Sequence, residues 1–197
     1  MIMEQVHELL YQALEVEQGG VLVYQAAIRC ASNEELRDEW TEYLEQTRRH
    51  EQILRDVFEA LVLDANRETP GRLIVRQKGQ ALVALMERAL AAGNLEAAQL
   101  VAAECIIDAE TRDHLNWELI GRVADQLKGH EARALKDAYK QVEDEEDEHL
   151  YHTMGWAREL WIESMGMPAV LPPPEEQKDV RSAIDAAKAK KSREKML

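Results

Sequence analysis

The chain has few of the residues that build disulfide frameworks, tight turns or membrane spans. Its 197 residues include two cysteines, nine glycines, five prolines and one phenylalanine. Cys30 and Cys105 form neither a CxxC pair nor a disulfide framework, so we expect reduced thiols and a cytoplasmic protein. No run approaches the roughly 20 apolar residues of a membrane-spanning helix. The first ten residues lack the basic flank of a signal peptide, and we expect no membrane association.

The residues that are abundant are helix formers. Ala, Leu, Glu, Gln and Arg dominate, and 46% of the chain is hydrophobic while 31% is charged. This composition suits one domain with an adequate core, and it predicts an all-α protein. The formal net charge of −14 repels phosphate backbones, so we expect no nucleic-acid partner. Such a surface also attracts cations, but ordinary solubility is the simpler explanation.

Apolar stripes with helical spacing divide the chain into long helices. The predicted helices cover residues 3–31, 34–63, 95–127 and 131–164, with a short amphipathic helix at 79–91 in the long crossover. Thr69-Pro70-Gly71 is typical of a turn, so residues 64–77 are predicted to be irregular. Prolines between 168 and 174 end the last helix. We therefore expect a bundle domain, 1–167, and a charged tail, 168–197, that is flexible or weakly helical.

Each long helix carries polar residues in the middle of its inward stripe. The second helix has Thr47 and His50 there, and the last has Glu146 and His149. A Glu followed three residues later by a His is the metal-ligand unit of ferritin-like four-helix bundles. Buried carboxylates and imidazoles are costly unless they are paired or bound to a metal. The sequence thus raises the question of whether these interruptions meet.

The interruptions can be placed by arithmetic, because residues at one depth of a helical hairpin have numbers whose mean falls in the connecting turn. Glu17 and Thr47 average 32, which is the first turn. In the third helix we take the stripe through Asp108 as inward, and Asp108 and Glu146 average 127, at the second turn. Both hairpins then place their polar residues at the same depth. This match favours a metal site inside the bundle.

The chain resembles the ferritin-like superfamily of di-iron and di-manganese carboxylate proteins. Within it, the chain is most similar to the bacterial stress-associated ferritin-like proteins of the YciE/YciF type. The similarity lies in EYLEQTRRHEQILRDVFEAL, in the crossover helix that begins near Lys78-Gly79 and in EDEEDEH, and it covers about residues 5–165. It implies an up-down-down-up four-helix bundle with two Fe or Mn ions. It also implies a ferroxidase or peroxide-scavenging oxidoreductase that uses O₂ or peroxide in stress defence.

The family pattern also assigns ligands, because two helices each give a Glu and the other two each give Glu-x-x-His. The metal ligands implied by the resemblance are Glu17, His50, Asp108, Glu146 and His149. Thr47 stands where the second helix should offer its Glu, which leaves three carboxylates for two divalent ions. Glu51 or Glu104 could supply a fourth, or the site holds one metal or none. The residues expected around the ligands are Thr47, Tyr24, Tyr43 and His152.

Each of these residues also fits an ordinary structural role. An EDEEDE run is usually a solvated helix face, and Glu146 and His149 could form a surface ion pair. The missing Glu at position 47 leaves open a non-catalytic bundle with a degenerate metal site, acting as a dimeric structural or interaction protein. A metal-storage cage is a third possibility. The expected homodimer interface is a second apolar side of the third helix, with Trp161 nearby: Leu100, Ile107 and Trp117.

Overall fold

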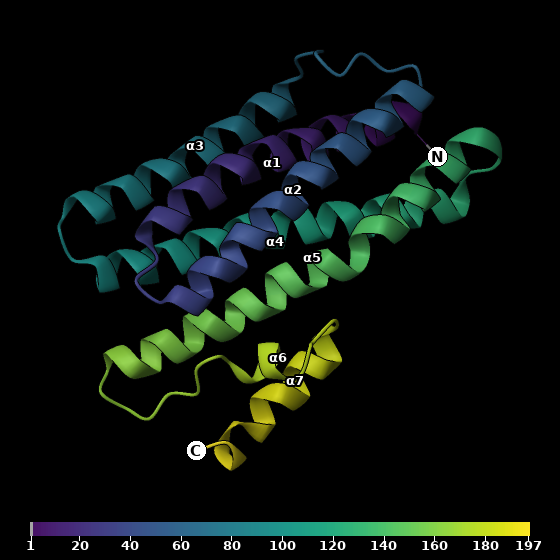
Figure 1. Cartoon of the computed structure of the whole chain (residues 1–197). Helices are drawn as coiled ribbons and strands as arrows, with labels where there is room; N and C mark the ends of the chain where they lie inside the picture. Colours follow the sequence, from purple (N-terminus) through teal and green to yellow (C-terminus); the bar gives the residue numbers. More distant parts are fainter. Residues whose placement is uncertain (1) are drawn as a thin grey trace.

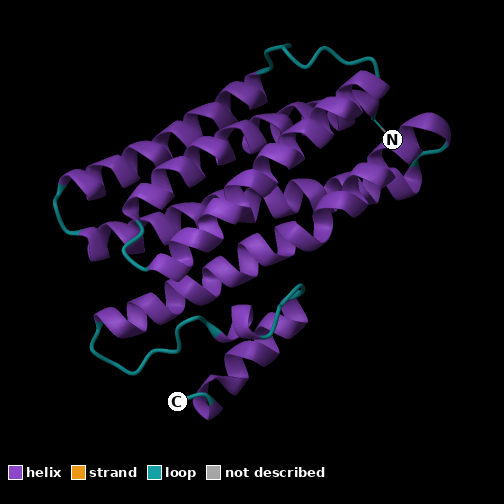
Figure 2. Ribbon diagram, in the orientation of Figure 1, coloured by secondary structure: helices purple, strands orange, loops and turns teal. Residues whose placement is uncertain are grey.

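The computed structural model describes residues 2–197, and within that range the chain is all-helical, with no β-strand (Figures 1 and 2). This confirms the all-α prediction. The long helices are α1 (Met3–Cys30), α2 (Glu34–Ala60), α3 (Pro70–Ala91), α4 (Leu95–Gln126) and α5 (Gly129–Ser164). They are followed by α6 (Pro174–Gln177), α7 (Ala183–Ser192) and the 3₁₀-helix η1 (Arg193–Lys195). No helix in the described part of the chain combines the length and apolarity needed to cross a bilayer.

Four of the helices pack in a closed ring. Helix α1 contacts α2 and α4, and α5 contacts the same two helices from the other side. The short connections after α1 and α4 reverse the chain, whereas the long connection through α3 lets α2 and α4 run in the same direction (Figure 1). Helix α3 lies outside the ring along α1 and α4. As a result, α1 and α4 each pack against three of the long helices, whereas α2 and α5 each pack against two.

The crossover helix is longer than the sequence analysis predicted. Helix α3 begins at Pro70, and the prediction of an irregular segment up to residue 77 is wrong for residues 70–77. Thr69 is the helix N-cap, since its Oγ1 accepts a hydrogen bond from the Arg72 N–H at 3.1 Å, and Pro70 takes the first helical position. The same residues suit a turn or a helix start. A buried ion pair between Arg72 and Glu15 of α1 fixes the choice.

The hydrophobic core consists of two clusters that draw on all four ring helices. One gathers around Trp40, Tyr24 and Trp156. The other gathers around Phe58 and Trp117. Between these clusters each ring helix carries buried polar residues. The bundle therefore has apolar packing on both sides of a polar layer at mid-length, which limits the access of water to that layer.

Residues 168–197 are ordered against α5. Val180 is buried, and its carbonyl oxygen accepts a hydrogen bond of 3.1 Å from His152 Nε2. Glu175 accepts two hydrogen bonds from Arg158, each of 2.7 Å. Helices α6 and α7 lie beside α5 (Figure 1). The division of the chain into a bundle and a tail stays a prediction.

Candidate metal centre

The polar layer brings together most of the ligands predicted from the sequence. His50 and His149 are both fully buried, and their ring centroids are 5.7 Å apart. Glu17 and Glu146 are buried beside them. The stripes of α2 and α5 run as predicted, from Trp40 through His50 on α2 and from Val142 to Leu160 on α5. Two imidazoles and two carboxylates from three helices thus share one interior space.

Two overlapping groups of three residues in this layer could each hold a metal ion. One group is Glu17, His50 and Glu146, and the other is Glu110, Glu146 and His149. His50 Nδ1 lies 2.9 Å from Glu146 Oε1 and 3.9 Å from Glu17 Oε1. His149 Nδ1 lies 3.5 Å from Glu110 Oε2 and 3.6 Å from Glu146 Oε1. Glu146 belongs to both groups.

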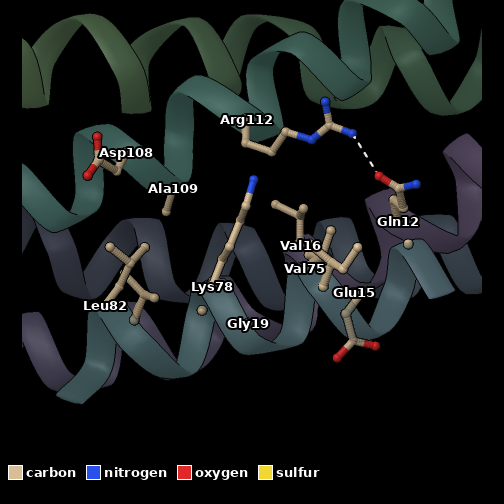
Figure 3. Close-up of a pocket in the computed structure, with 15 residues that line it drawn as sticks. Gln12, Glu15, Val16, Gly19, Val75, Lys78, Leu82, Asp108, Ala109 and Arg112 are labelled. Carbon is tan, nitrogen blue, oxygen red and sulfur yellow. Dashed lines mark hydrogen bonds between the residues drawn. The ribbon is translucent and has the colours of Figure 1, made fainter.

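The acid that α4 contributes is Glu110, and the predicted inward position of Asp108 is wrong. Asp108 is exposed and lines a groove of about 380 Å³ between α1, α3 and α4, together with Lys78 and Arg112 (Figure 3). The buried side of α4 starts with small residues, Ala102 and Ala103, which give a weak apolar signal in the sequence. The hairpin arithmetic does not separate the two acids, because the means with Glu146 are 127 for Asp108 and 128 for Glu110, and both fall between α4 and α5.

A further acid, Asp113, lies on the same stripe of α4 and was not predicted. It follows Glu110 by three residues and is 4% exposed. The layer therefore contains four buried carboxylates and two imidazoles. We define the polar layer by these six residues: Glu17, His50, Glu110, Asp113, Glu146 and His149.

The outer nitrogen of each imidazole is held by an acceptor outside the layer. His50 Nε2 lies 2.7 Å from Glu145 Oε2, and His149 Nε2 lies 2.6 Å from Gln46 Oε1. A carboxylate or amide oxygen can only accept, so each Nε2 carries the hydrogen in the neutral ring. The other nitrogen, Nδ1, then presents a lone pair to the carboxylates of the layer. This arrangement is the one that orients metal-binding histidines.

Each residue of the polar layer also has one buried side-chain atom that makes no well-oriented hydrogen bond to another described residue, although His50 Nδ1 lies 2.9 Å from Glu146 Oε1. These atoms are Glu17 Oε2, His50 Nδ1, Glu110 Oε2, Asp113 Oδ1, Glu146 Oε2 and His149 Nδ1. Buried polar atoms are nearly always satisfied, so six such atoms in one layer require an explanation. All six are oxygen or nitrogen donors of the kind that binds divalent first-row metals.

The carboxylates of the layer also repel one another. Burial raises the pKa of Glu17 well above its usual range, and repulsion from Asp113 and Glu146 raises it further. Burial and the charges of Glu146 and Glu110 raise the pKa of Asp113 in the same way. The pKa of Glu146 is raised by burial and by Glu110, against the opposing effect of His149. Two divalent cations would balance four carboxylates.

The two extra ligands considered from the sequence lie outside the layer. Glu51 is half-buried and accepts hydrogen bonds from Arg55 and Gln18. Glu104 is exposed and accepts a hydrogen bond from Trp161 at 3.1 Å. The carboxylates of Glu51 and Glu104 each accept hydrogen bonds from side chains outside the polar layer. The structure therefore does not bring either residue to the layer.

Three of the predicted surrounding residues do lie around the layer. Tyr43 packs its ring 4.2 Å from the His149 ring, and the Tyr24 ring lies 6.0 Å from it. Burial and the nearby Glu110 raise the pKa of Tyr24 well above its usual range. Thr47 is buried, and its hydroxyl donates to the Tyr43 carbonyl oxygen at 2.8 Å. These contacts hold His149 from its apolar side.

His152 lies one turn beyond His149, and its ring faces other partners. Its Nδ1 lies 3.1 Å from the Tyr43 hydroxyl and 3.5 Å from Glu39. It therefore reaches His149 only through Tyr43, and it joins α5 to the segment around Val180.

Trp117 was predicted on an outer apolar side of α4, and that placement is wrong. It is 1% exposed, and its Nε1 donates to Glu17 Oε1 at 2.8 Å. Its ring also lies 6.3 Å from the His50 ring. Trp117 thus orients Glu17, whose Oε2 has no hydrogen-bond partner among the described residues. Leu100 and Ile107, the other two residues of that side, are half-buried against the first hydrophobic cluster.

Comparison with known proteins adds no family to these observations. No protein-family model, curated protein or solved structure matches the chain.

Proposed function

We propose that this protein is a ferritin-like di-metal carboxylate protein that binds two Fe or Mn ions in the polar layer. The single observation that carries the proposal is the set of buried oxygen and nitrogen atoms that lack a well-oriented hydrogen bond, one from each acid and imidazole of the layer. The order of α1, α2, α4 and α5, with the long crossover before α4, supports the up-down-down-up arrangement of such bundles. The shared carboxylate of Glu146 supports two ions rather than one.

The protein's own residues would hold and insulate the pair. His50 and His149 offer Nδ1, while Glu145 and Gln46 keep their rings in the required tautomer. Trp117 orients Glu17. Two hydrophobic clusters flank the layer and exclude water, which strengthens every electrostatic interaction inside it.

The activity that follows is a metal-dependent oxidoreductase of the ferroxidase or peroxide-scavenging type. Paired Fe or Mn ions, when bound, exchange electrons with O₂ or H₂O₂. A role in stress defence, a cytoplasmic location and a homodimer follow only from the sequence resemblance and composition, and they stay predictions.

Metal uptake tests the proposal directly. The purified protein is dialysed anaerobically against Fe²⁺ and, separately, against Mn²⁺, and bound metal is counted by elemental analysis. We expect two ions per chain, and one in His50→Ala or His149→Ala. His114→Ala is the matched control, because His114 pairs with Asp147 at 3.1 Å outside the layer. Wild-type protein that retains neither metal would contradict the proposal.

A second function is favoured by one observation, the threonine at position 47 where the family has a Glu. In this alternative the metal site is degenerate and the bundle acts as a structural or interaction protein. His50→Ala and His149→Ala would then leave function intact and change stability by at most about 1–2 kcal/mol. Consumption of O₂ or H₂O₂ by the metal-loaded wild type, and its loss in both variants, would decide against this alternative.

A further inference from the structure

Asp113 is the one acid of the polar layer that belongs to neither group of three. Its side chain is 4% exposed, and its Oδ1 has no hydrogen-bond partner among the described residues. It lies three residues after Glu110 on the inward stripe of α4. A buried carboxylate without a donor is costly unless a proton or a cation neutralises it, and a bound metal ion would do so.

The position of Asp113 along the bundle places it with Glu17 and His50. Helices α2 and α4 run in the same direction (Figure 1). The step from Glu110 to Asp113 therefore goes the same way as the step from Thr47 to His50, by roughly 4.5 Å in each helix. One turn further along α4, Trp117 donates to Glu17 and lies against His50.

Thr47 offers the layer a hydroxyl group and no carboxylate. Its Oγ1 is engaged with the Tyr43 carbonyl oxygen. Its methyl group faces α1, where a Cβ on Gly20 would come within 3.1 Å of it. Helices α1 and α2 are close at this point because both residues are small, so the carboxylate that α2 lacks must come from another helix.

We propose that Asp113 is a ligand of the metal position held by Glu17 and His50, and that it supplies from α4 the carboxylate missing at Thr47. This inference rests on the proposed metal function. It makes the two positions unequal. One has Glu17, His50 and Asp113 with the shared Glu146, whereas the other has Glu110 and His149 with the same Glu146. Four carboxylates then balance two divalent ions.

The test measures Mn²⁺ binding by equilibrium dialysis and elemental analysis. Asp113→Asn removes the charge and keeps the shape, and Asp108→Asn is the control on the exposed face of the same helix. We expect two ions in the wild type and in Asp108→Asn. In Asp113→Asn one of the two should bind at least about tenfold more weakly, since even an outer partner of a metal ligand is worth 10–100-fold. Thr47→Val should retain both ions.

Double variants assign the ion that is lost. His149→Ala leaves the Glu17–His50 position, and adding Asp113→Asn should weaken that remaining ion at least about tenfold. His50→Ala leaves the other position, and adding Asp113→Asn should change its affinity less than threefold. Thermal unfolding of each metal-free variant checks the fold, and Asp113→Asn should unfold no earlier than the wild type.

The outcomes separate this inference from the function on which it rests. A wild type that binds neither Mn²⁺ nor Fe²⁺ overturns both. A wild type with two ions and an Asp113→Asn variant that keeps both affinities within threefold overturns only the role of Asp113. The reverse pattern in the double variants, with the loss at the Glu110–His149 position, also overturns it.

Discussion

Two sets of buried carboxylates lie side by side in this protein, and they differ in what neutralises them. Glu15 is 5% exposed and lies two residues before Glu17 on α1, but it faces α3. Its Oε1 accepts a hydrogen bond of 2.6 Å from Arg76, and its Oε2 accepts one of 2.6 Å from Arg72. Glu17 faces the opposite side, toward the polar layer, where the described residues include no arginine or lysine among its partners.

A similar contrast holds along α5. Glu159 is fully buried, and Arg158, Arg193 and the Val170 N–H donate to its two oxygens. Glu146, about four turns earlier, has acids and imidazoles as its neighbours. Buried carboxylates that serve structure are paired with arginine within the chain. Within the described part of the chain, the acids of the polar layer have no arginine partner, and this difference separates the candidate metal centre from ordinary buried ion pairs.

The largest expected effect comes from replacing a buried glutamate by glutamine, once among the arginine-paired acids and once in the polar layer. Glu15→Gln leaves Arg72 buried without its charge partner and should lower the free energy of unfolding by about 3–5 kcal/mol. Glu146→Gln removes a charge from a crowd of like charges and should leave metal-free protein at least as stable as the wild type. Urea denaturation of both variants with a chelator present measures this. Equal decreases in the free energy of unfolding of the two variants would show that both sets of acids stabilise the metal-free fold to the same extent.

Bound metal should stabilise the fold through the acids of the polar layer and not through the arginine-paired acids. At a free concentration of 100 times the Kd, Mn²⁺ is expected to add about 2.7 kcal/mol to the free energy of unfolding. For a chain of this size that raises Tm by roughly 5–10 °C. Differential scanning calorimetry with and without Mn²⁺ measures the shift. Glu146→Gln should lose the shift, and Glu159→Gln should keep it in full, whatever its own Tm.

The acceptors behind the imidazoles should set metal affinity more than stability. Gln46→Leu removes the oxygen that holds His149 Nε2, so the ring is free to turn and change tautomer. Mn²⁺ affinity should fall about 10–100-fold at one of the two positions. Isothermal titration measures it, with Gln52→Leu on the exposed face of the same helix as the control. Unchanged affinity in Gln46→Leu would show that this acceptor does not act on the metal position.

The smallest effect is a pH dependence of the arginine-paired set. Burial alone would raise the pKa of Glu159, but the Val170 N–H, Arg158 and Arg193 outweigh it and hold the pKa below its usual value. The folded pKa is thus below the unfolded one, so the stability from this group is present above about pH 4.3 and is lost as the pH falls through the folded pKa. Glu159→Gln should cost about 1.5 kcal/mol at pH 7.

The pH prediction is measured as a difference. Urea denaturation of wild type and Glu159→Gln at a series of pH values should show the gap closing as the solution is acidified below about pH 4. A gap that stays constant across this range would mean that the carboxylate charge of Glu159 is not what stabilises the fold.

The sequence predicted the polar layer on three helices and missed it on the fourth, for a reason visible in the packing. Helices α2 and α5 have one main apolar face, so the stripes through His50 and through His149 were unambiguous. Helix α4 packs on α1, α5 and α3, so it is apolar on more than one face. The spacing of apolar residues in α4 was compatible with two choices of inward face. The face through Asp108 was the wrong choice, and the face through Glu110 and Asp113 is the buried one.

Two local signals also had a second meaning that only the assembled fold resolves. Thr69-Pro70 suits a turn and a helix start equally well, and the contact of Arg72 with Glu15 favours the helix. Trp117 looked like part of an outer apolar side, yet the carboxylate of Glu17, 100 positions away in the chain, accepts its N–H. Neither partner can be found from the neighbouring residues.

The sequence by itself determined that the chain is helical, where most of the long helices end, and that acids and histidines interrupt the inward stripes of α1, α2 and α5. These properties depend on side-chain spacing within one helix and on short turns, which are local. The tertiary structure alone decided that Glu110 and Asp113, rather than Asp108, face the interior, and which buried acids have arginine partners. The rotation of a helix and the pairing of its charges depend on which neighbours pack against each face, and those neighbours come from distant parts of the chain.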